Sequence, residues 1–157
     1  MKRVVFAGGG TGGHLYPALN LAAALEALRA DVQIHFAGAK RGIEARVLPE
    51  KGMPHVLLPL EPIRRSRVWQ NWRLAASAVG TLRGLRELGR RVDPDLVVGT
   101  GGYASGPVGL WAILRGTPLA LQEQNSVPGL ATRWLSRRAR QIHLGFPEAA
   151  DALAPGP

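Results

Sequence analysis

The chain has 157 residues, of which 46% are apolar and 20% charged, values that are ordinary for a folded soluble domain and exclude a disordered one. It has no cysteine, which excludes disulfide bonds and thiolate metal sites, and its four histidines are scattered, so we expect no metal site. Twenty Lys and Arg residues against eleven Asp and Glu give a net charge of +9, which favours anionic partners, although a compositional bias of the source organism explains the charge equally well.

Strand-like and helix-like segments alternate along the chain. Apolar and β-branched runs predict six strands, at 2–7, 32–37, 55–60, 96–99, 118–122 and 141–146. Helical periodicity predicts helices at about 15–29, 42–51, 68–91, 110–114 and 130–138. This alternation is typical of a parallel sheet covered on both faces. We therefore predict an α/β protein with a Rossmann-like doubly wound parallel sheet that binds its ligands at the carboxyl ends of the strands.

The first strand ends in a glycine-rich loop that leads into a helix. Gly8, Gly10 and Gly13 fit the G-x-G-x-x-G pattern, in which a tight backbone turn and the positive end of a helix hold phosphate groups. Pro17 suits the first turn of that helix. A dinucleotide site also needs a carboxylate at the end of the second strand, and a Walker loop needs Gly-Lys-Ser or Gly-Lys-Thr; both are missing here. The loop therefore predicts a different phosphate or diphosphate site.

Two more polar segments follow later strands. Residues 99–107 read Gly-Thr-Gly-Gly-Tyr-Ala-Ser-Gly-Pro, a second glycine loop that opens a helix. Two such loops at one edge of a sheet can hold a diphosphate between two helix N-termini, although a tight turn explains either loop alone. Residues 122–129 read Gln-Glu-Gln-Asn-Ser-Val-Pro-Gly, and four neighbouring polar side chains are costly to bury without partners. They favour a functional site, although Asn125 can alternatively cap the next helix.

Three motifs, in this order and spacing, resemble those of the bacterial MurG family within glycosyltransferase family 28. They are Gly-Gly-Thr-Gly-Gly-His-x-x-Pro-Ala-Leu at 9–19, Gly-Gly-Tyr-x-Ser-Gly-Pro at 101–107 and Glu-Gln-Asn at 123–125. The resemblance covers about residues 2–147 and implies the amino-terminal half of a GT-B glycosyltransferase. It implies an acceptor-side Rossmann-like domain at 1–147 and the start of an interdomain linker at 148–157, with the carboxyl-terminal donor domain missing from this sequence.

The resemblance implies a reaction as well. Such enzymes transfer N-acetylglucosamine from UDP-N-acetylglucosamine, with inversion, to the muramoyl 4-hydroxyl of lipid I, which gives lipid II for peptidoglycan synthesis. The acceptor is a muramoyl peptide linked to a polyprenyl diphosphate, and we expect no cofactor and no metal. Because most contacts to the donor come from the other domain, we expect this chain alone to be inactive.

The resemblance also assigns roles to single residues. His14 is the best candidate for the general base that deprotonates the acceptor hydroxyl, since imidazole titrates near neutral pH, and Glu123 competes for that role. A histidine buried in the core is the alternative for His14. Substrate contacts are expected at Thr11, Gly12, Gly13, Gly101, Gly102, Tyr103, Ser105, Gln124 and Asn125. The family usually has histidine where this chain has Gln122, and because glutamine cannot take up a proton, this difference favours His14 as the base.

Cations and tryptophans share the start of the longest predicted helix, at Arg64, Arg65, Arg67, Trp69 and Trp72. Tryptophan sits at the headgroup level of membranes, and basic residues are attracted to anionic lipid. The alternative is that the tryptophans pack on the sheet while the arginines are solvated. No apolar run reaches the roughly 18 residues that cross a bilayer, and the amino terminus has no signal-peptide pattern. We therefore expect a cytoplasmic protein, peripheral on the anionic cytoplasmic face of the cell membrane.

Two alternatives remain open. The chain resembles, in its extent, the acceptor subunit of the two-chain eukaryotic N-acetylglucosaminyltransferase, a natural half-enzyme that needs a partner chain. A non-enzymatic module that binds anions or nucleic acid would account for the arginines. However, the arginines are dispersed, and the aromatic residues do not line a strand face as in RNA-binding sheets, so we expect no nucleic-acid partner.

Overall fold

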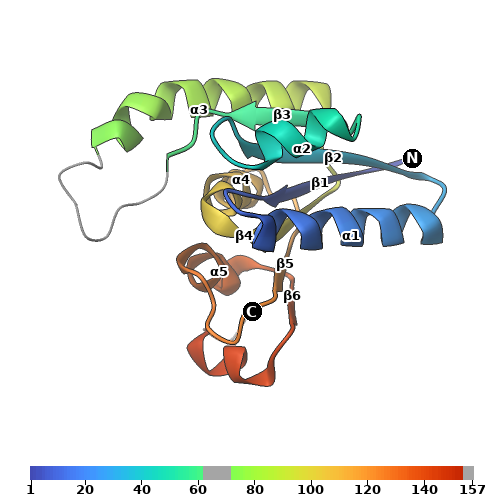
Figure 1. The fold of residues 1–157 in the computed structure, drawn as a ribbon, viewed down its shortest axis with the longest axis vertical. Helices are drawn as coiled ribbons and strands as arrows, with labels where there is room; N and C mark the ends of the chain where they lie inside the picture. Colours follow the sequence, from blue (N-terminus) through green and yellow to red (C-terminus); the bar gives the residue numbers. More distant parts are fainter. Residues whose placement is uncertain (62–71, 154–157) are drawn as a thin grey trace.

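In the computed structural model, which describes residues 1–61 and 72–153, a six-stranded parallel sheet carries helices on both faces (Figure 1). The strands are β1 (Lys2–Gly8), β2 (Val32–Ala39), β3 (His55–Leu58), β4 (Leu96–Gly101), β5 (Leu119–Glu123) and β6 (Gln141–Leu144). The helices are α1 (Gly12–Leu28), α2 (Glu44–Glu50), α3 (Trp72–Arg91), α4 (Gly102–Leu114) and α5 (Leu130–Leu135), with the 3₁₀ segments η2 (Ser136–Arg138) and η3 (Pro147–Ala152). The predicted fold class and the order of elements are confirmed.

The order of the strands brings the two glycine loops together. The sheet runs β3-β2-β1-β4-β5-β6, and every neighbouring pair is parallel. This is the doubly wound order, in which the connections leave the two central strands, β1 and β4, toward opposite sides. Gly8 at the end of β1 is paired with Gly101 at the end of β4. The loops that follow these strands therefore start side by side, at the place where such sheets bind ligands.

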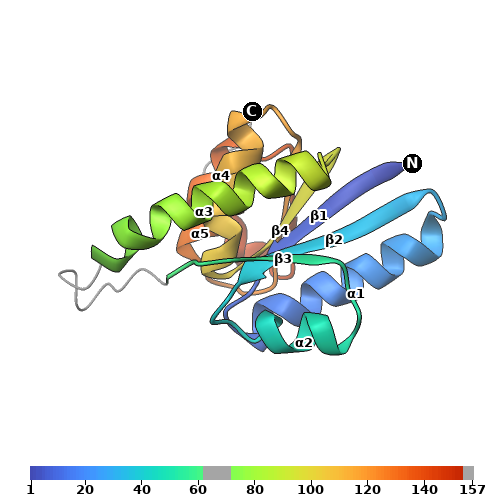
Figure 2. The same ribbon diagram turned by 90° about the horizontal axis from the view of Figure 1, so that it is seen from above.

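Alternating side chains of the strands form two cores. Val4 and Phe6 of β1 face α1 and α2, and the rings of Phe6 and Phe36 stack with their centroids 5.8 Å apart. Val5 and Ala7 face the other way, toward a core that contains residues of α3, α4 and α5. Figure 2 shows α3 on one side of β1 and β2, with α1 and α2 on the opposite side.

Both helices that follow glycine loops begin inside those loops. α1 begins at Gly12 instead of residue 15, so Pro17 lies in the second helical turn instead of the first. In α4, Pro107 is likewise five residues after the first helical residue, Gly102. A proline in this position cannot donate to the carbonyl four residues earlier, so each helix begins with a turn in which one carbonyl lacks that partner.

Other predicted boundaries shift by a few residues. β3 ends at Leu58 and β6 at Leu144, two residues before their predicted ends. The segment expected to begin the linker starts with η3, in which Ala149 is fully buried. The predicted start of the long helix at residue 68 lies outside the described residues.

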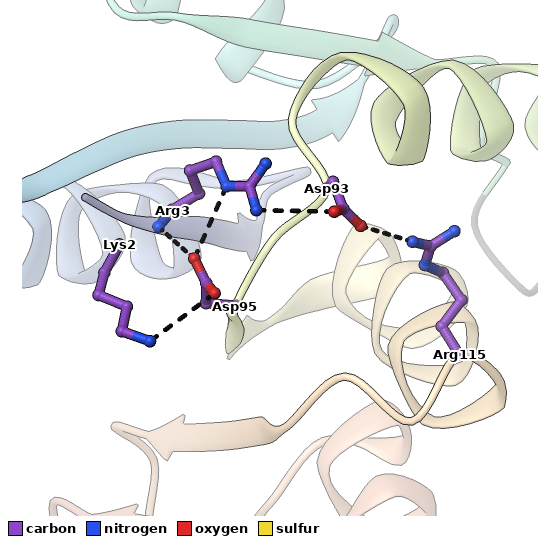
Figure 3. A network of polar contacts seen from close by, with 5 residues as sticks. All are labelled: Lys2, Arg3, Asp93, Asp95 and Arg115. Carbon is purple, nitrogen blue, oxygen red and sulfur yellow. Dashed lines mark hydrogen bonds and ion pairs between the residues drawn. The ribbon is translucent and has the colours of Figure 1, made fainter.

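Charged side chains form a network where the strands begin, at the end of the sheet opposite to the glycine loops (Figure 3). Asp95, just before β4, accepts a hydrogen bond of 2.8 Å from the backbone N–H of Arg3 and lies 3.9 Å from the ammonium group of Lys2. Asp93 lies 3.6 Å from the Arg3 guanidinium and accepts a 2.8 Å bond from Arg115, which follows α4. This network joins β1, β4 and the end of α4 at the edge away from the glycine loops.

Candidate functional site

Thr100 links the two glycine loops. Its hydroxyl donates a 2.8 Å hydrogen bond to the carbonyl oxygen of His14, and its own carbonyl oxygen lies 3.2 Å from Nδ1 of the His14 ring. The threonine is fully buried, whereas His14 is half-buried. The sequence alone does not reveal the role of Thr100, because that role depends on the pairing of β1 with β4.

The two loops touch through positions where only glycine fits. Gly102 has a φ of +77°, and a Cβ added there would lie 2.0 Å from the carbonyl oxygen of Gly9. At Gly101 an added Cβ would lie 2.7 Å from Nδ1 of His14. The glycines of the second loop therefore serve the close approach of the first loop and of its histidine.

A third segment completes the junction. The terminal amide nitrogen of Gln124, just after β5, lies 2.7 Å from Nδ1 of His14. His14 is half-buried and its ring has polar partners at the end of β4 and in the loop after β5, so it is not a core histidine. The structure thus brings together His14, Thr100 and Gln124 at the carboxyl edge of the sheet.

The starts of α1 and α4 are open to an anion. Their N-cap residues, Thr11 and Gly101, make no side-chain capping bond, and neither first turn has an acidic residue. The first N–H groups of a helix lack intrahelical partners and carry the positive end of its dipole. Thr11 and Gly13 are exposed, and Gly12 and Gly102 are half-buried. Two helix ends side by side at this edge are therefore suited to a diphosphate.

The side chain of Tyr103 extends from the second glycine loop to the first. Its ring occupies the space beside Gly10, where an added Cβ would lie 2.4 Å from the ring. Burial, and then the negative charges of Glu44 and Glu61, raise the pKa of the Tyr103 phenol. Its hydroxyl therefore stays protonated at neutral pH and is able to donate a hydrogen bond.

Glu44, which no sequence motif had singled out, supports the first glycine loop. Its carboxylate is fully buried and accepts hydrogen bonds from the N–H of Gly10, at 2.9 Å and 3.1 Å, and from the N–H of Ala39 at 2.7 Å. An added Cβ at Gly9 would lie 2.1 Å from this carboxylate. A carboxylate does therefore lie at the end of β2, but it binds backbone and is closed to a nucleotide ribose.

Glu123 has a similar role in the third segment. The side chain is 1% exposed, and Oε1 accepts bonds from the backbone N–H of Asn125 at 3.1 Å and from its side-chain amide at 2.8 Å. Oε2 accepts a 3.2 Å bond from the N–H of Gly129. Asn125 is exposed and does not cap α5, whose N-cap is Gly129 without a side-chain bond. The capping alternative for Asn125 is therefore wrong, and Glu123 holds the exposed asparagine in place.

Ser105 lies inside the domain. It is 1% exposed, and its hydroxyl lies 2.6 Å from where a Cβ of Gly99 would be. This position gives no support to the expected contact between Ser105 and a substrate. Burial of its small side chain instead allows α4 to pack closely on β4.

The tryptophan and arginine segment is described only at its end. Arg64, Arg65, Arg67 and Trp69 lie outside the described residues. Trp72 is 62% exposed, so the alternative in which it packs on the sheet is wrong. It lines a cavity of about 500 Å³ with residues that follow β2 and β3 or belong to α3: Lys40, Arg41, Pro59, Leu60, Glu61, Ala76 and Ser77.

Two kinds of feature are missing from the described part of the chain. No helix within residues 1–61 and 72–153 is long and apolar enough to span a membrane. The same residues contain no group of three or more His, Asp or Glu side chains placed to hold a metal ion.

Comparison with known proteins identifies relatives for nearly the whole chain. The family model described as "Glycosyltransferase family 28 N-terminal domain" matches residues 4–144. A transferase of Moorella thermoacetica, named UDP-N-acetylglucosamine--N-acetylmuramyl-(pentapeptide) pyrophosphoryl-undecaprenol N-acetylglucosamine transferase, is 47% identical over 95% of this chain and 40% of its own length. A protein of the same name from Salinibacter ruber is 46% identical over 94% of this chain and 40% of its own length.

Solved structures show the same relationship. The crystal structure of Acinetobacter baumannii MurG matches 95% of this chain and 42% of its own, with 32% identity and a TM-score of 0.73. The glycosyltransferase SsfS6 from Streptomyces sp. SF2575 shares the fold, with a TM-score of 0.59 and 18% identity. The chain thus spans about 40% of the length of the curated relatives it matches.

Proposed function

The chain belongs to the family of glycosyltransferase family 28 N-terminal domains, and we propose that it is the acceptor-binding domain of an inverting N-acetylglucosaminyltransferase. In this proposal the enzyme transfers N-acetylglucosamine from UDP-N-acetylglucosamine to the muramoyl 4-hydroxyl of lipid I, which gives lipid II in peptidoglycan synthesis. The relatives are named for that donor and that acceptor. The observation that carries the proposal is the junction of His14, Thr100 and Gln124 beside two open helix N-termini.

We assign residues 1–147 to the acceptor-binding domain and 148–157 to the start of a linker. The donor is held mainly by a second domain, so this chain alone is inactive in the proposal. Reading the coding sequence beyond Pro157 distinguishes a single two-domain chain from a natural half-enzyme that needs a partner chain.

The acceptor diphosphate lies at the helix ends. N–H groups of Gly12, Gly13 and Gly102 face the phosphate oxygens, and the positive dipole ends of α1 and α4 favour the negative charge. The Tyr103 hydroxyl adds a donor on the acceptor side. The exposed Asn125, held by Glu123, contacts the donor sugar nucleotide when the second domain closes.

His14 is the general base in this proposal. A base has to lie within hydrogen-bond reach of the hydroxyl that it deprotonates, and His14 is the imidazole at the junction of the loops. Glu123 is the weaker alternative, since both of its oxygens already accept hydrogen bonds inside its own loop. The base takes the proton of the muramoyl 4-hydroxyl. At the same time the hydroxyl oxygen attacks the anomeric carbon of the donor N-acetylglucosamine, and UDP leaves.

Calorimetric titration of the purified chain tests the binding proposal. One titrant is a short-chain polyprenyl-diphosphate muramoyl pentapeptide, and the others are its monophosphate counterpart and UDP-N-acetylglucosamine. We expect measurable binding of the diphosphate, weaker binding of the monophosphate, and weak or no binding of the sugar nucleotide. Tight donor binding without acceptor binding would show that this is not the acceptor domain.

We further propose that the domain lies on an anionic membrane through α3 and the segment before it, on the cytoplasmic face of the cell membrane. Trp72, Val79 and Leu82 of α3 are 62%, 57% and 55% exposed. Arg83, Arg86 and Arg90 continue that face of the helix at spacings of three and four residues, and all three are exposed. Exposed apolar residues followed by cations suit a headgroup layer, where each basic residue contributes about 1 kcal/mol.

Vesicle pelleting tests the membrane proposal. Trp72→Ala, Arg65→Ala and Arg86→Ala are expected to lower the fraction of protein that pellets with vesicles of phosphatidylglycerol and phosphatidylcholine. Arg140→Ala removes the same charge beside β6 and serves as the matched control. Equal pelleting of all four variants and the unaltered chain, or equal pelleting with pure phosphatidylcholine, would contradict it.

A further inference from the structure

We infer that Gln124 is a positioning residue that fixes the tautomer of His14, by presenting its amide oxygen to Nδ1 and so leaving Nε2 free to accept a proton. The inference rests on the proposed function for its catalytic meaning. The tautomer itself is a property of the free protein and can be measured without any substrate.

The first step comes from Thr100. Its carbonyl oxygen lies 3.2 Å from Nδ1 of His14, and a carbonyl oxygen can only accept a hydrogen bond. The contact is therefore favourable only when Nδ1 carries the proton. In a neutral imidazole the other nitrogen, Nε2, then has no proton and is a hydrogen-bond acceptor.

The second step comes from the amide of Gln124. Its nitrogen is placed 2.7 Å from the same Nδ1, yet an Nδ1 that carries a proton cannot accept a bond from an N–H group. Rotating the terminal amide by half a turn exchanges its oxygen and nitrogen, which have nearly the same shape. The oxygen then faces Nδ1–H, and the ring donates to the oxygens of both Gln124 and Thr100.

The third step concerns two buried oxygens. In the orientation with the nitrogen toward His14, Oε1 of Gln124 is buried and has no hydrogen-bond partner within the described residues, which is costly. Rotation gives this oxygen a donor. Gln122, two positions earlier, also has a buried Oε1 without a partner there.

The consequence is a division of roles around one ring. Thr100 at the end of β4 and Gln124 just after β5 hold Nδ1–H, which fixes both the orientation of the ring and the position of its proton. Nε2 is the atom left to take the proton of the acceptor hydroxyl. Gln124 then acts through His14, without itself contacting the reacting atoms.

Nitrogen-15 NMR of the ring, with ¹⁵N-histidine-labelled chain at about pH 8.5, tests the inference well above the usual titration range of imidazole. Protonated and bare ring nitrogens resonate in separate regions of the spectrum. We expect His14 to carry its proton on Nδ1 in the unaltered chain. A spectrum with the proton on Nε2 overturns the inference, whether or not the chain binds lipid I.

Three variants isolate the contribution of Gln124. Gln124→Leu removes the acceptor and is expected to give a mixture of the two tautomers. Gln124→Glu keeps an oxygen at Nδ1 in either rotamer and is expected to retain the Nδ1–H form. Gln33→Leu makes the same chemical change at an exposed position of β2 and is the matched control. An unchanged tautomer in Gln124→Leu, with a folded spectrum, assigns the effect to Thr100 alone and contradicts the role of Gln124.

Discussion

At the scale of single residues, the polar side chains of the site divide into those that face the open edge and those that hold other groups in place. His14 and Asn125 are accessible, whereas Thr100, Glu44 and Glu123 are buried and bind backbone or neighbouring side chains. A buried carboxylate that accepts several N–H groups fixes the loop that carries them. Substitutions in the two groups should therefore affect different measurements, catalysis in one and stability in the other.

Replacing His14 should greatly lower the rate at which N-acetylglucosamine is transferred. A chimera in which this chain replaces the amino-terminal domain of the Moorella thermoacetica relative provides a two-domain enzyme for the assay. His14→Ala is expected to lower its kcat by at least ~100-fold, the usual scale for the loss of a general base. His143→Ala, at an exposed position of β6, is the control. Near-normal turnover of His14→Ala would exclude His14 as the base.

Replacing Glu44 should destabilise the domain. Glu44→Gln keeps the size of the side chain but turns an N–H group toward backbone donors, and hydrogen bonds to a charged group contribute about 1.5–3 kcal/mol. We expect a loss of about that free energy of unfolding, measured by urea denaturation. Glu50→Gln makes the same change at the exposed end of α2 and should alter stability little. Similar midpoints for both variants would mean that the Gly10 contact is unimportant.

At the scale of elements, the glycine loops and the sheet that carries them could be predicted from the sequence. Gly8 to Gly13 and Gly99 to Gly106 follow apolar runs and precede helices, a local pattern that needs no knowledge of the fold. The start of α1 could not be predicted correctly from the sequence, because glycine has a low helix propensity. Gly12 and Gly13 are nevertheless helical in the structure, where α1 packs against β4.

The role of Glu44 was also hidden from the sequence. Its carboxylate reaches back to Ala39, the last residue of β2, and across to Gly10 after β1, and that contact depends on β1 and β2 being neighbours. In the same way, Gln124 could be chosen as a site residue from its position after a strand. Its contact with His14 becomes visible only with the strand order.

The contact between the loops predicts a difference between two glycines. Gly102 and Gly116 both have positive φ, +77° and +71°, but only Gly102 has a backbone atom where a Cβ would lie. Gly116→Ala should cost about 1–2 kcal/mol from backbone strain alone. Gly102→Ala should cost distinctly more, because the carbonyl of Gly9 must also move. Equal changes in the urea midpoint would show that the loops do not press on each other.

At the scale of the whole molecule, the functional edge and the stabilising ion network lie at opposite ends of the strands. The network of Arg3, Asp93 and Asp95 joins the amino ends of β1 and β4, whose carboxyl ends carry the glycine loops (Figure 3). Substitutions in this network should therefore change the free energy of unfolding without changing the affinity for the acceptor.

Asp95 gives that network a pH dependence. The hydrogen bond from the Arg3 backbone, together with the charges of Lys2 and Arg3, lowers the pKa of Asp95 below its usual value. A lowered carboxyl pKa stabilises the fold above the unfolded pKa of about 4, and the contribution disappears as the pH falls through the folded value. Asp95→Asn should therefore unfold at lower urea than the unaltered chain at pH 7, and the gap should close at acid pH. Asp151→Asn is the exposed control.

The junction at His14 also has a consequence for the order of events during synthesis. His14 and Gln124 are 110 positions apart, so a ribosome adding roughly 5–20 residues per second makes the histidine about 6–22 s before the glutamine. During that interval β1 and α1 exist without the loop after β5, and the ring lacks one of its two partners. The arrangement of polar groups around His14 therefore forms only after the segment that follows β5 has been translated.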